Sequence, residues 1–313
     1  MSNKIKIIYL ATPEIASESF EFFINSKDYD VLALVVQPPK GQIRGKKIEH
    51  KIVKVAKENN IKIFEPEKIS KDIELIKNLK SLEPDFMVTF AFGQILSQEV
   101  IDIPKYATIN LHASLLPKYR GANPIAQSII DGCKYTGITT MKTVLELDAG
   151  DICLQEKIEI PDNMNVIELM EKISSKSPDL LDRTLKGLFE NTLKPVKQDE
   201  KEATFTKKLK KEEKVIDWNM DYIALHNKIR GMYKINTNNT TYNNKLIQIL
   251  KTETSDSTNG ENGEITDIAK EGITVKCSNG SIKILTVKPE GKGEMNASDW
   301  ANGARIKKGD RFI

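Results

Sequence analysis

Two stretches decide the fold of this chain: Ile5-Lys-Ile-Ile-Tyr-Leu10 and Val31-Leu-Ala-Leu-Val-Val36. Each is a short, nearly continuous apolar run, which is typical of a strand buried on both faces of a parallel sheet. Phe86–Phe90 has the same character, and Ile61–Phe64 and Thr108–Leu111 are also predicted strands. The first part of the chain is therefore built on a buried sheet.

Amphipathic stretches separate these strands. Glu14–Asn25, Ile48–Asn59 and Asp72–Lys80 have helical spacing, with apolar residues on one face and polar residues on the other. Alternation of strands and helices predicts an α/β fold, with a doubly wound, mostly parallel, Rossmann-like sheet. Ligands are then expected at the carboxyl ends of the strands. Further strands are predicted near Gly137–Leu145 and Cys153–Glu159.

The character of the chain changes after Asn191, where a long predicted helix ends. A lysine-rich stretch with little apolar periodicity follows and is predicted to be a linker. We therefore expect a catalytic domain over residues 1–191, a linker over 192–208 and a smaller domain over 209–313.

The smaller domain is predicted to consist mainly of β-strands. After one helix, Tyr222–Met232, short strands recur between turn residues, a rhythm typical of a small barrel or sandwich. The Asn- and Thr-rich segment Asn236–Asn244 is expected to be an exposed loop. The predicted strands are Leu246–Leu250, Gly263–Ile268, Ile273–Cys277 and Ile282–Val287.

Composition excludes several classes of protein. With 39% hydrophobic and 29% charged residues, the 313-residue chain is globular rather than disordered or fibrous. A formal net charge of only +3 means that any nucleic-acid contact must come from a local patch. Three widely separated cysteines suit a reducing cytosol, and no apolar run approaches the roughly 18 residues of a membrane span. We expect a soluble, cytoplasmic protein.

The stretch richest in chemistry is Asn110-Leu-His-Ala-Ser-Leu-Leu-Pro117, directly after a predicted strand. On an extended chain, residues two apart point the same way, so Asn110 and His112 are expected side by side. Two hydrogen-bond donors there suit a developing oxyanion. About 36 residues on, Asp148 follows another strand, and its carboxylate can hold His112 protonated or accept a proton. A purely structural histidine fits the same spacing.

Other common catalytic motifs are missing from the sequence. It contains no GxSxG, P-loop or HExxH, and the lack of GxGxxG disfavours a nicotinamide cofactor. The three histidines are far apart and have no neighbouring ligands, so we expect no metal. His50 and His226 are expected to be surface or capping groups. Trp218 and Trp300 are expected to anchor the core or a domain interface rather than stack on bases.

Motifs along almost the whole chain match one family. They are Ala11-Thr-Pro13, Arg44-Gly-Lys-Lys47, Ala91-Phe-Gly93, Asn110-Leu-His-Ala-Ser-Leu-Leu-Pro117, Arg120-Gly-Ala122, Leu147-Asp-Ala-Gly-Asp151 and Ile216-Asp-Trp218. With them the chain resembles the folate-dependent formyltransferase family. The Asn-x-His and Asp set marks the whole superfamily. The basic loop and the Ile-Asp-Trp motif are more specific to the branch that acts on tRNA.

The resemblance implies a reaction and a site. Asn110, His112 and Asp148 would form the catalytic centre, without a metal. The formyl group of 10-formyltetrahydrofolate, a co-substrate, would pass to the α-amino group of methionine on initiator tRNA for translation initiation. The C-terminal domain would be OB-like and hold the tRNA, and we expect a monomer. The segment associated with folate consists of Ser114, Leu115, Leu116 and Pro117.

The predicted tRNA contact lies in a basic run between Lys40 and Lys54. By itself such a run is often only a solvated loop. Placed at the active edge of the sheet, it can reach the phosphates of an acceptor stem. Two departures from the family pattern are Ile43, where glycine is usual, and the segment after Gly231. The residues that the resemblance assigns to tRNA binding are Arg44, Lys46 and Lys47.

Three alternatives remain open. Formylation of an amino-sugar nucleotide would use the same Asn, His and Asp, but would not need the basic loop. Hydrolysis or formylation of a purine precursor is disfavoured by the long C-terminal domain. A folate- or tRNA-binding module that has lost activity is disfavoured by the intact Asn110, His112 and Asp148.

Overall fold

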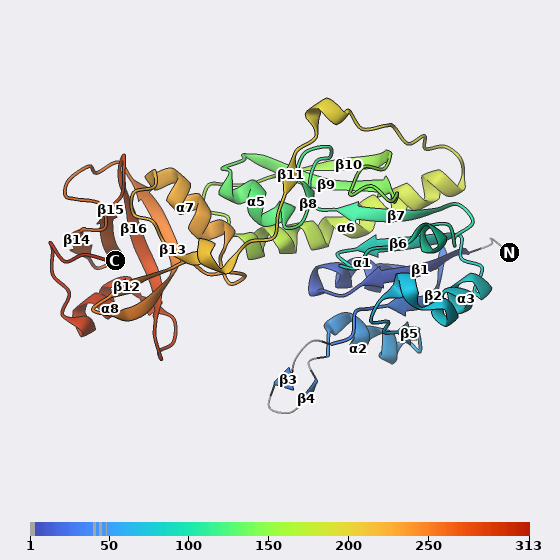
Figure 1. The fold of residues 1–313 in the computed structure, drawn as a ribbon, viewed down its shortest axis with the longest axis horizontal. Coiled ribbons are helices and arrows are strands. Elements are labelled where there is room, and N and C mark those ends of the chain that lie inside the picture. The colour runs from blue at the N-terminus through green and yellow to red at the C-terminus, as the bar shows by residue number, and fades with distance from the viewer. Residues whose placement is uncertain (1–3, 40–41, 44–45, 48) are drawn as a thin grey trace. The chain divides into compact units, whose positions relative to one another are not determined.

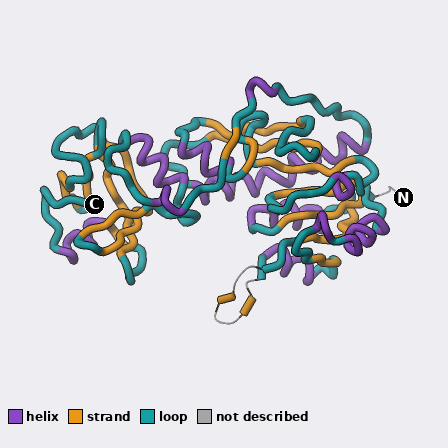
Figure 2. The backbone as a smooth tube through the Cα atoms, viewed as in Figure 1, coloured by secondary structure: helices purple, strands orange, loops and turns teal. Residues whose placement is uncertain are grey.

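The computed structural model describes residues 4–39, 42–43, 46–47 and 49–313. The chain divides into two compact units, which Figures 1 and 2 show as a ribbon and as a tube. Unit 1 consists of Met1–Gly121, Gly137–Ile158 and Met170–Phe205. Unit 2 consists of Ala122–Thr136, Glu159–Leu169 and Thr206–Ile313.

Strands and helices alternate through the first part of the chain, and strands dominate the last part. The strands are β1 (Ile5–Ala11), β2 (Tyr29–Val35), β3 (Gln42–Ile43), β4 (Lys46–Lys47), β5 (Lys62–Phe64), β6 (Phe86–Phe90), β7 (Ala107–His112), β8 (Arg120–Gly121), β9 (Tyr135–Lys142), β10 (Ile152–Glu159), β11 (Phe205–Thr206), β12 (Asn239–Tyr242), β13 (Lys245–Ser255), β14 (Ile265–Ala269), β15 (Gly272–Lys276), β16 (Ser281–Pro289) and β17 (Met295–Asn296). The α-helices are α1 (Ser17–Asn25), α2 (Lys51–Glu58), α3 (Ile73–Ser81), α4 (Gln98–Ile101), α5 (Pro124–Ile130), α6 (Val166–Phe189), α7 (Tyr222–Gly231) and α8 (Ala297–Ala304).

Unit 1 is built on a seven-stranded sheet with the order β10-β9-β7-β6-β1-β2-β5. β1 pairs in parallel with β2 and β6, and β6 pairs in parallel with β7, whereas β9 is antiparallel to β7. This order confirms the predicted doubly wound, mostly parallel sheet (Figure 1). The chain first builds outward from β1 and then returns to its other side with β6. The carboxyl ends of β1, β6 and β7 are therefore the expected place for a ligand.

Helices cover both faces of this sheet because alternate residues of β1 point to opposite sides. Tyr9 packs against Phe20 and Phe23 of α1, with ring centroids 5.4 and 6.0 Å away. Its neighbours Ile8 and Leu10 belong instead to the apolar cluster that contains residues of α3 and α4. The continuous apolar run therefore serves two cores, as the sequence predicted.

The long helix α6 packs against the sheet of unit 1 on the face that α1 also covers. The Thr184 hydroxyl lies 2.7 Å from that of Thr140 on β9, and the Tyr29 hydroxyl donates to Asp182 over 2.9 Å. Tyr29 also meets the Phe23 ring edge-on at 4.7 Å. No helix in the described part of the chain, α6 included, has the length and apolarity needed to cross a membrane.

Unit 2 holds an antiparallel sheet with the order β12-β13-β16-β15-β14, in which β17 also pairs with β16. Its core contains Trp218 and Trp300, each 6% exposed. Both indoles stack on Phe312, with centroids 5.4 and 5.9 Å from its ring. The expectation that the tryptophans anchor a core is confirmed, and the unit is consistent with the predicted small OB-like domain.

The predicted exposed loop at Asn236–Asn244 was wrong, because this segment contains β12. Asn238 and Thr240 are buried although they are polar. Both side chains make internal hydrogen bonds. Thr240 accepts a hydrogen bond from Trp218 Nε1 at 3.2 Å, and Asn238 Nδ2 donates to the Lys214 carbonyl at 3.1 Å. Among the described residues, Asn238 Oδ1 has no partner. Paired polar groups can be buried at little cost, which composition does not reveal.

The prediction that His226 is a surface or capping group was also wrong. The side chain is buried in unit 2, where it lines a cavity of about 620 Å³. Its Nε2 donates to the Asp162 carbonyl at 3.1 Å, so the neutral ring accepts from the Thr252 hydroxyl at Nδ1, 2.9 Å away. Both nitrogens of the uncharged ring are therefore paired.

This burial predicts a pH-dependent stability. Desolvation lowers the pKa of His226 below its ordinary value of about 6.5. The unfolded chain then binds a proton here at a higher pH than the folded chain does. The free energy of unfolding is therefore expected to fall as the pH drops below about 6.5, and His226→Gln should lessen that fall. Thermal melts of both proteins at pH 7.5 and 5.5 measure this. If the wild type and His226→Gln lost the same stability between pH 7.5 and 5.5, His226 would not be the group responsible.

Candidate active site

Asn110 and His112 lie two residues apart at the end of β7. Thr89 of β6 stands directly beside Asn110 in the parallel pairing, and its hydroxyl donates to Asn110 Oδ1 over 2.8 Å. In the structure, the Asn110 amide oxygen therefore faces Thr89. The Asn110 amide nitrogen is thereby turned away from Thr89 and carries the hydrogens available to a substrate oxygen.

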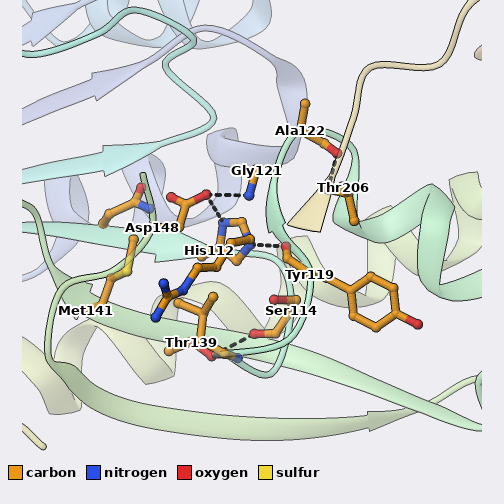
Figure 3. A network of polar contacts seen from close by, with 12 residues as sticks. His112, Ser114, Tyr119, Gly121, Ala122, Thr139, Met141, Asp148 and Thr206 are labelled. Carbon is orange, nitrogen blue, oxygen red and sulfur yellow. Dashed lines mark hydrogen bonds and ion pairs between the residues drawn. The ribbon is translucent and has the colours of Figure 1, made fainter. Parts of the chain in front are cut away.

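His112 is 6% exposed and has a neighbour at each ring nitrogen (Figure 3). Nε2 donates to the Tyr119 carbonyl at 2.9 Å, because a carbonyl oxygen can only accept. Nδ1 lies 3.6 Å from Asp148 Oδ2, which is close enough for an ion pair but longer than a direct hydrogen bond. Nδ1 is therefore the nitrogen that can exchange a proton with Asp148 or with a substrate.

Asp148 is brought to His112 by the long connection between β9 and β10. Its backbone has a φ of 51°, in the left-handed region that Asp tolerates better than most residues. Its carboxylate accepts a 2.7 Å hydrogen bond from the Gly121 amide. A side chain 36 residues away in sequence thus faces the imidazole, as the sequence predicted.

Gly150 closes the turn that carries Asp148. A Cβ at this position would lie 1.7 Å from the Lys142 carbonyl oxygen at the end of β9. The Lys142 amide in turn donates to the Asp151 carbonyl over 3.0 Å. Only glycine lets the turn approach β9 this closely.

The four residues associated with folate divide into two kinds. Ser114 and Leu116 are buried, and the Leu116 amide donates to the Thr139 hydroxyl at 3.2 Å. The Ser114 hydroxyl is also used internally, since it donates to the carbonyl four residues on. Leu115 and Pro117 are half-exposed, so these two side chains present the surface of the segment.

Three residues were predicted to contact tRNA: Arg44, Lys46 and Lys47. Arg44 lies outside the described residues. Lys46 and Lys47 form β4, which pairs antiparallel with β3, where Ile43 is opposite Lys46. The basic run therefore contains a short pair of strands rather than only a loop.

The sequence alone missed three residues that border the site. They are Tyr119, which receives the His112 hydrogen bond, and Arg120 and Gln198, which lie behind the Asp148 turn. Arg120 stood in a recognised motif, but Gln198 fell in the predicted linker and gave no signal.

The site has the chemistry of an acid–base centre with an amide donor. Within the ranges that the structure describes, no group of three or more His, Cys, Asp and Glu side chains is placed to hold a metal ion. Asn110 supplies hydrogen-bond donors, while His112 and Asp148 can pass a proton between them. Such a set suits attack of a nucleophile on a carbonyl carbon.

Two family models match most of the chain. The formyl transferase model covers residues 4–185, and the model of the formyl transferase C-terminal domain covers residues 208–305. This chain belongs to the formyl transferase family. The resemblance seen in the sequence motifs is thereby confirmed.

Full-length relatives in the family carry a more specific name. The chain is 42% identical to the methionyl-tRNA formyltransferase of Clostridium acetobutylicum over 97% of this chain and 98% of that protein. It is 40% identical to that of Fusobacterium nucleatum over 98% and 100%. A solved structure with this fold is the N-formyltransferase of Helicobacter canadensis in complex with folinic acid and dTDP-3-aminofucose. It aligns with a TM-score of 0.67 and 19% identity over 90% of this chain and 98% of that one.

Proposed function

We propose that this chain transfers the formyl group of 10-formyltetrahydrofolate to the α-amino group of methionine on initiator tRNA. The observation that carries the proposal is the similarity to methionyl-tRNA formyltransferases, which extends over 97% of the chain and includes the C-terminal unit. The acceptor is therefore aminoacylated tRNA and the donor a folate. Because this substrate is used at the start of translation, we propose that the enzyme works in the cytoplasm. We also expect it to act as a monomer.

The proposed chemistry assigns a role to each of the three side chains. The methionine amine attacks the formyl carbon, forming a new C–N bond, and the bond from that carbon to folate N10 then breaks. The Asn110 amide donates to the oxyanion that forms between these steps. The amine loses one proton and N10 gains one, and the pair of His112 and Asp148 is placed to carry it.

The folate is proposed to lie against Ser114–Pro117. Leu115 and Pro117 supply half-exposed apolar surface there. Leu115 itself packs on Gly137, where an added Cβ would come within 2.4 Å of a Leu115 methyl carbon. Buried Ser114 and Leu116 would hold the segment in shape rather than contact the ligand.

We expect Arg44→Ala to weaken use of tRNA and to spare folate. If Arg44 neutralises an acceptor-stem phosphate, its loss raises KM for methionyl-tRNA. The slope of log affinity for tRNA against log salt concentration should also become shallower by about 1. KM for 10-formyltetrahydrofolate should stay unchanged. Steady-state kinetics at two salt concentrations measures both. Equal losses for the two substrates would show that Arg44 supports the structure of the loop instead.

A competition assay separates the proposal from formylation of an amino-sugar nucleotide. Initiator methionyl-tRNA and a dTDP-linked amino sugar are offered together with limiting 10-formyltetrahydrofolate. We expect nearly all formyl groups to appear on the tRNA. Comparable rates on the sugar nucleotide would contradict the proposed substrate.

A further inference from the structure

The segment before β11 contacts two loops of the active site in unit 1. Figure 2 draws it as a loop broken by one short helical turn, Glu200–Glu202. Near its start, Val196 pairs with Ile152 through two 2.8 Å backbone hydrogen bonds, just after the Asp148 turn. Near its end, the Thr204 hydroxyl accepts from the Tyr119 amide at 2.8 Å. The segment thus touches both the loop with the carbonyl that orients His112 and the turn with the carboxylate.

Gln198, in the middle of this segment, uses both ends of its carboxamide. Nε2 donates to the carbonyls of Asp148 and Gly150, at 2.8 and 2.7 Å. Oε1 accepts from Nε and Nη2 of Arg120, at 3.0 and 2.8 Å. Carbonyls only accept and a guanidinium only donates, so this amide can sit in one orientation alone. It clamps the backbone of the Asp148 turn to Arg120.

Arg120 is the fixed end of this clamp. Its side chain is fully buried and makes a two-point ion pair with Glu200, at 2.9 and 2.7 Å. The hydrogen bonds to Glu200 raise the pKa of Arg120, and those to Arg120 lower the pKa of the carboxyl. A buried guanidinium paired in this planar way has little freedom to move.

The two supports of Asp148 meet at β8. Gly121, next to Arg120 in the chain, donates its amide to the Asp148 carboxylate. Gln198 joins the Asp148 backbone to the Arg120 side chain. The carboxylate that faces His112 is therefore held from its side chain and from its backbone by one dipeptide. Without Gln198, the link from the Asp148 backbone to Arg120 is lost, and the Gly121 bond to the carboxylate remains.

We propose that Gln198 is a positioning residue, which holds the Asp148 turn so that the carboxylate faces Nδ1 of His112. The inference rests on the proposed formyl transfer for its kinetic effect. Gln198 acts through Asp148 and needs no contact with either substrate. A loss of about 10- to 100-fold in rate is usual when a partner that orients a reacting group is removed.

The kinetic test uses Gln198→Met, which keeps the length of the side chain and removes its hydrogen bonds. The matched control is Gln98→Met, an exposed glutamine on α4 that bonds only Asp102 among the described contacts. We expect kcat to fall about 10- to 100-fold for Gln198→Met, with KM for both substrates within about threefold. The control should match the wild type. A rise in KM with an unchanged kcat would overturn the proposal.

A double-mutant cycle shows whether the effect passes through Asp148. In an Asp148→Asn background, adding Gln198→Met is expected to lower kcat by less than about threefold more. A residue that only stabilises the fold would cost the same factor in both backgrounds. That result would overturn the proposal. If Gln198→Met fails to fold, Gln198→Asn, whose amide is too short for both partners, takes its place.

A measurement without substrate separates this inference from the proposed function. The chain has three histidines, so ¹⁵N-histidine labelling gives three rings, and His112→Ala identifies the one of interest. We expect Gln198→Met to shift the His112 Nδ1 resonance in the same direction as Asp148→Asn does, and Gln98→Met to leave it in place. An unmoved resonance in Gln198→Met would overturn the positioning role, even if the enzyme proved to use another acceptor.

Discussion

His112→Ala is expected to lower kcat for formyl transfer by about two to four orders of magnitude, the range found when an acid–base group is removed. His112 connects the reacting centre to Asp148, and its Nδ1 is the nitrogen not used by the Tyr119 carbonyl. KM for the folate should change little, because the ring is not part of the Ser114–Pro117 surface. Steady-state kinetics at saturating substrates measures the loss, and circular dichroism checks the fold.

His50→Ala is the matched control for this variant. His50 precedes α2, and its side chain makes no capping hydrogen bond to that helix. We expect its kcat to equal that of the wild type. A His112→Ala enzyme that keeps more than about a tenth of the activity would show that the histidine is structural, since acid–base groups contribute more than this.

Gly150→Ala is expected to reduce kcat by on the order of 100-fold, the cost of moving a reacting group by about 1 Å. The added methyl would lie 1.7 Å from the Lys142 carbonyl oxygen, a backbone atom at the end of β9. The turn must shift to relieve this contact. Asp148, two residues away, then moves relative to His112. Steady-state kinetics of the purified variant measures the fall in kcat, and its thermal midpoint of unfolding measures the effect on stability.

Gly293→Ala is the matched control, because a methyl there would meet no atom within 4 Å. It should change neither kcat nor the midpoint. A normal kcat in Gly150→Ala would contradict the claim that the position of Asp148 limits the reaction. Loss of rate in both variants would point to a general effect of reducing backbone freedom.

The architecture of unit 1 could be predicted because its signal is local. The apolar runs of β1 and β2 exceed what one buried face needs, and the structure confirms that Tyr9 and Ile8 serve opposite faces. The pair Asn110 and His112 was predictable for the same reason, since both lie on one strand. Periodicity fixes which residues share a face over a few positions.

Features that depend on distant partners were not predictable in this way. Asn238 looks like a loop residue until the carbonyls it pairs with are known. His226 is buried because Asp162 and Thr252, far away in sequence, satisfy its ring. The short helices α5 and α8 were missed as well, since neither is long enough for a clear periodic pattern.

The candidate site shows the same division. The link from His112 to Asp148 was inferred from two strand ends and a family resemblance, and the structure places the two side chains 3.6 Å apart. Gln198 lies in a lysine-rich stretch without periodicity, and its importance comes only from bonds to residues about 50 and 80 positions away. Composition predicts a linker there, whereas in the structure Gln198 joins the Asp148 turn to Arg120 through hydrogen bonds.

The most direct test of the account is a formyl-transfer assay with purified protein and ¹⁴C-labelled 10-formyltetrahydrofolate. Initiator methionyl-tRNA and elongator methionyl-tRNA are offered in separate reactions, with His112→Ala run beside the wild type. We expect rapid labelling of the methionine on initiator tRNA by the wild type, much slower labelling of the elongator, and almost none by the variant. Failure of the wild-type protein to label initiator methionyl-tRNA would contradict the proposed function.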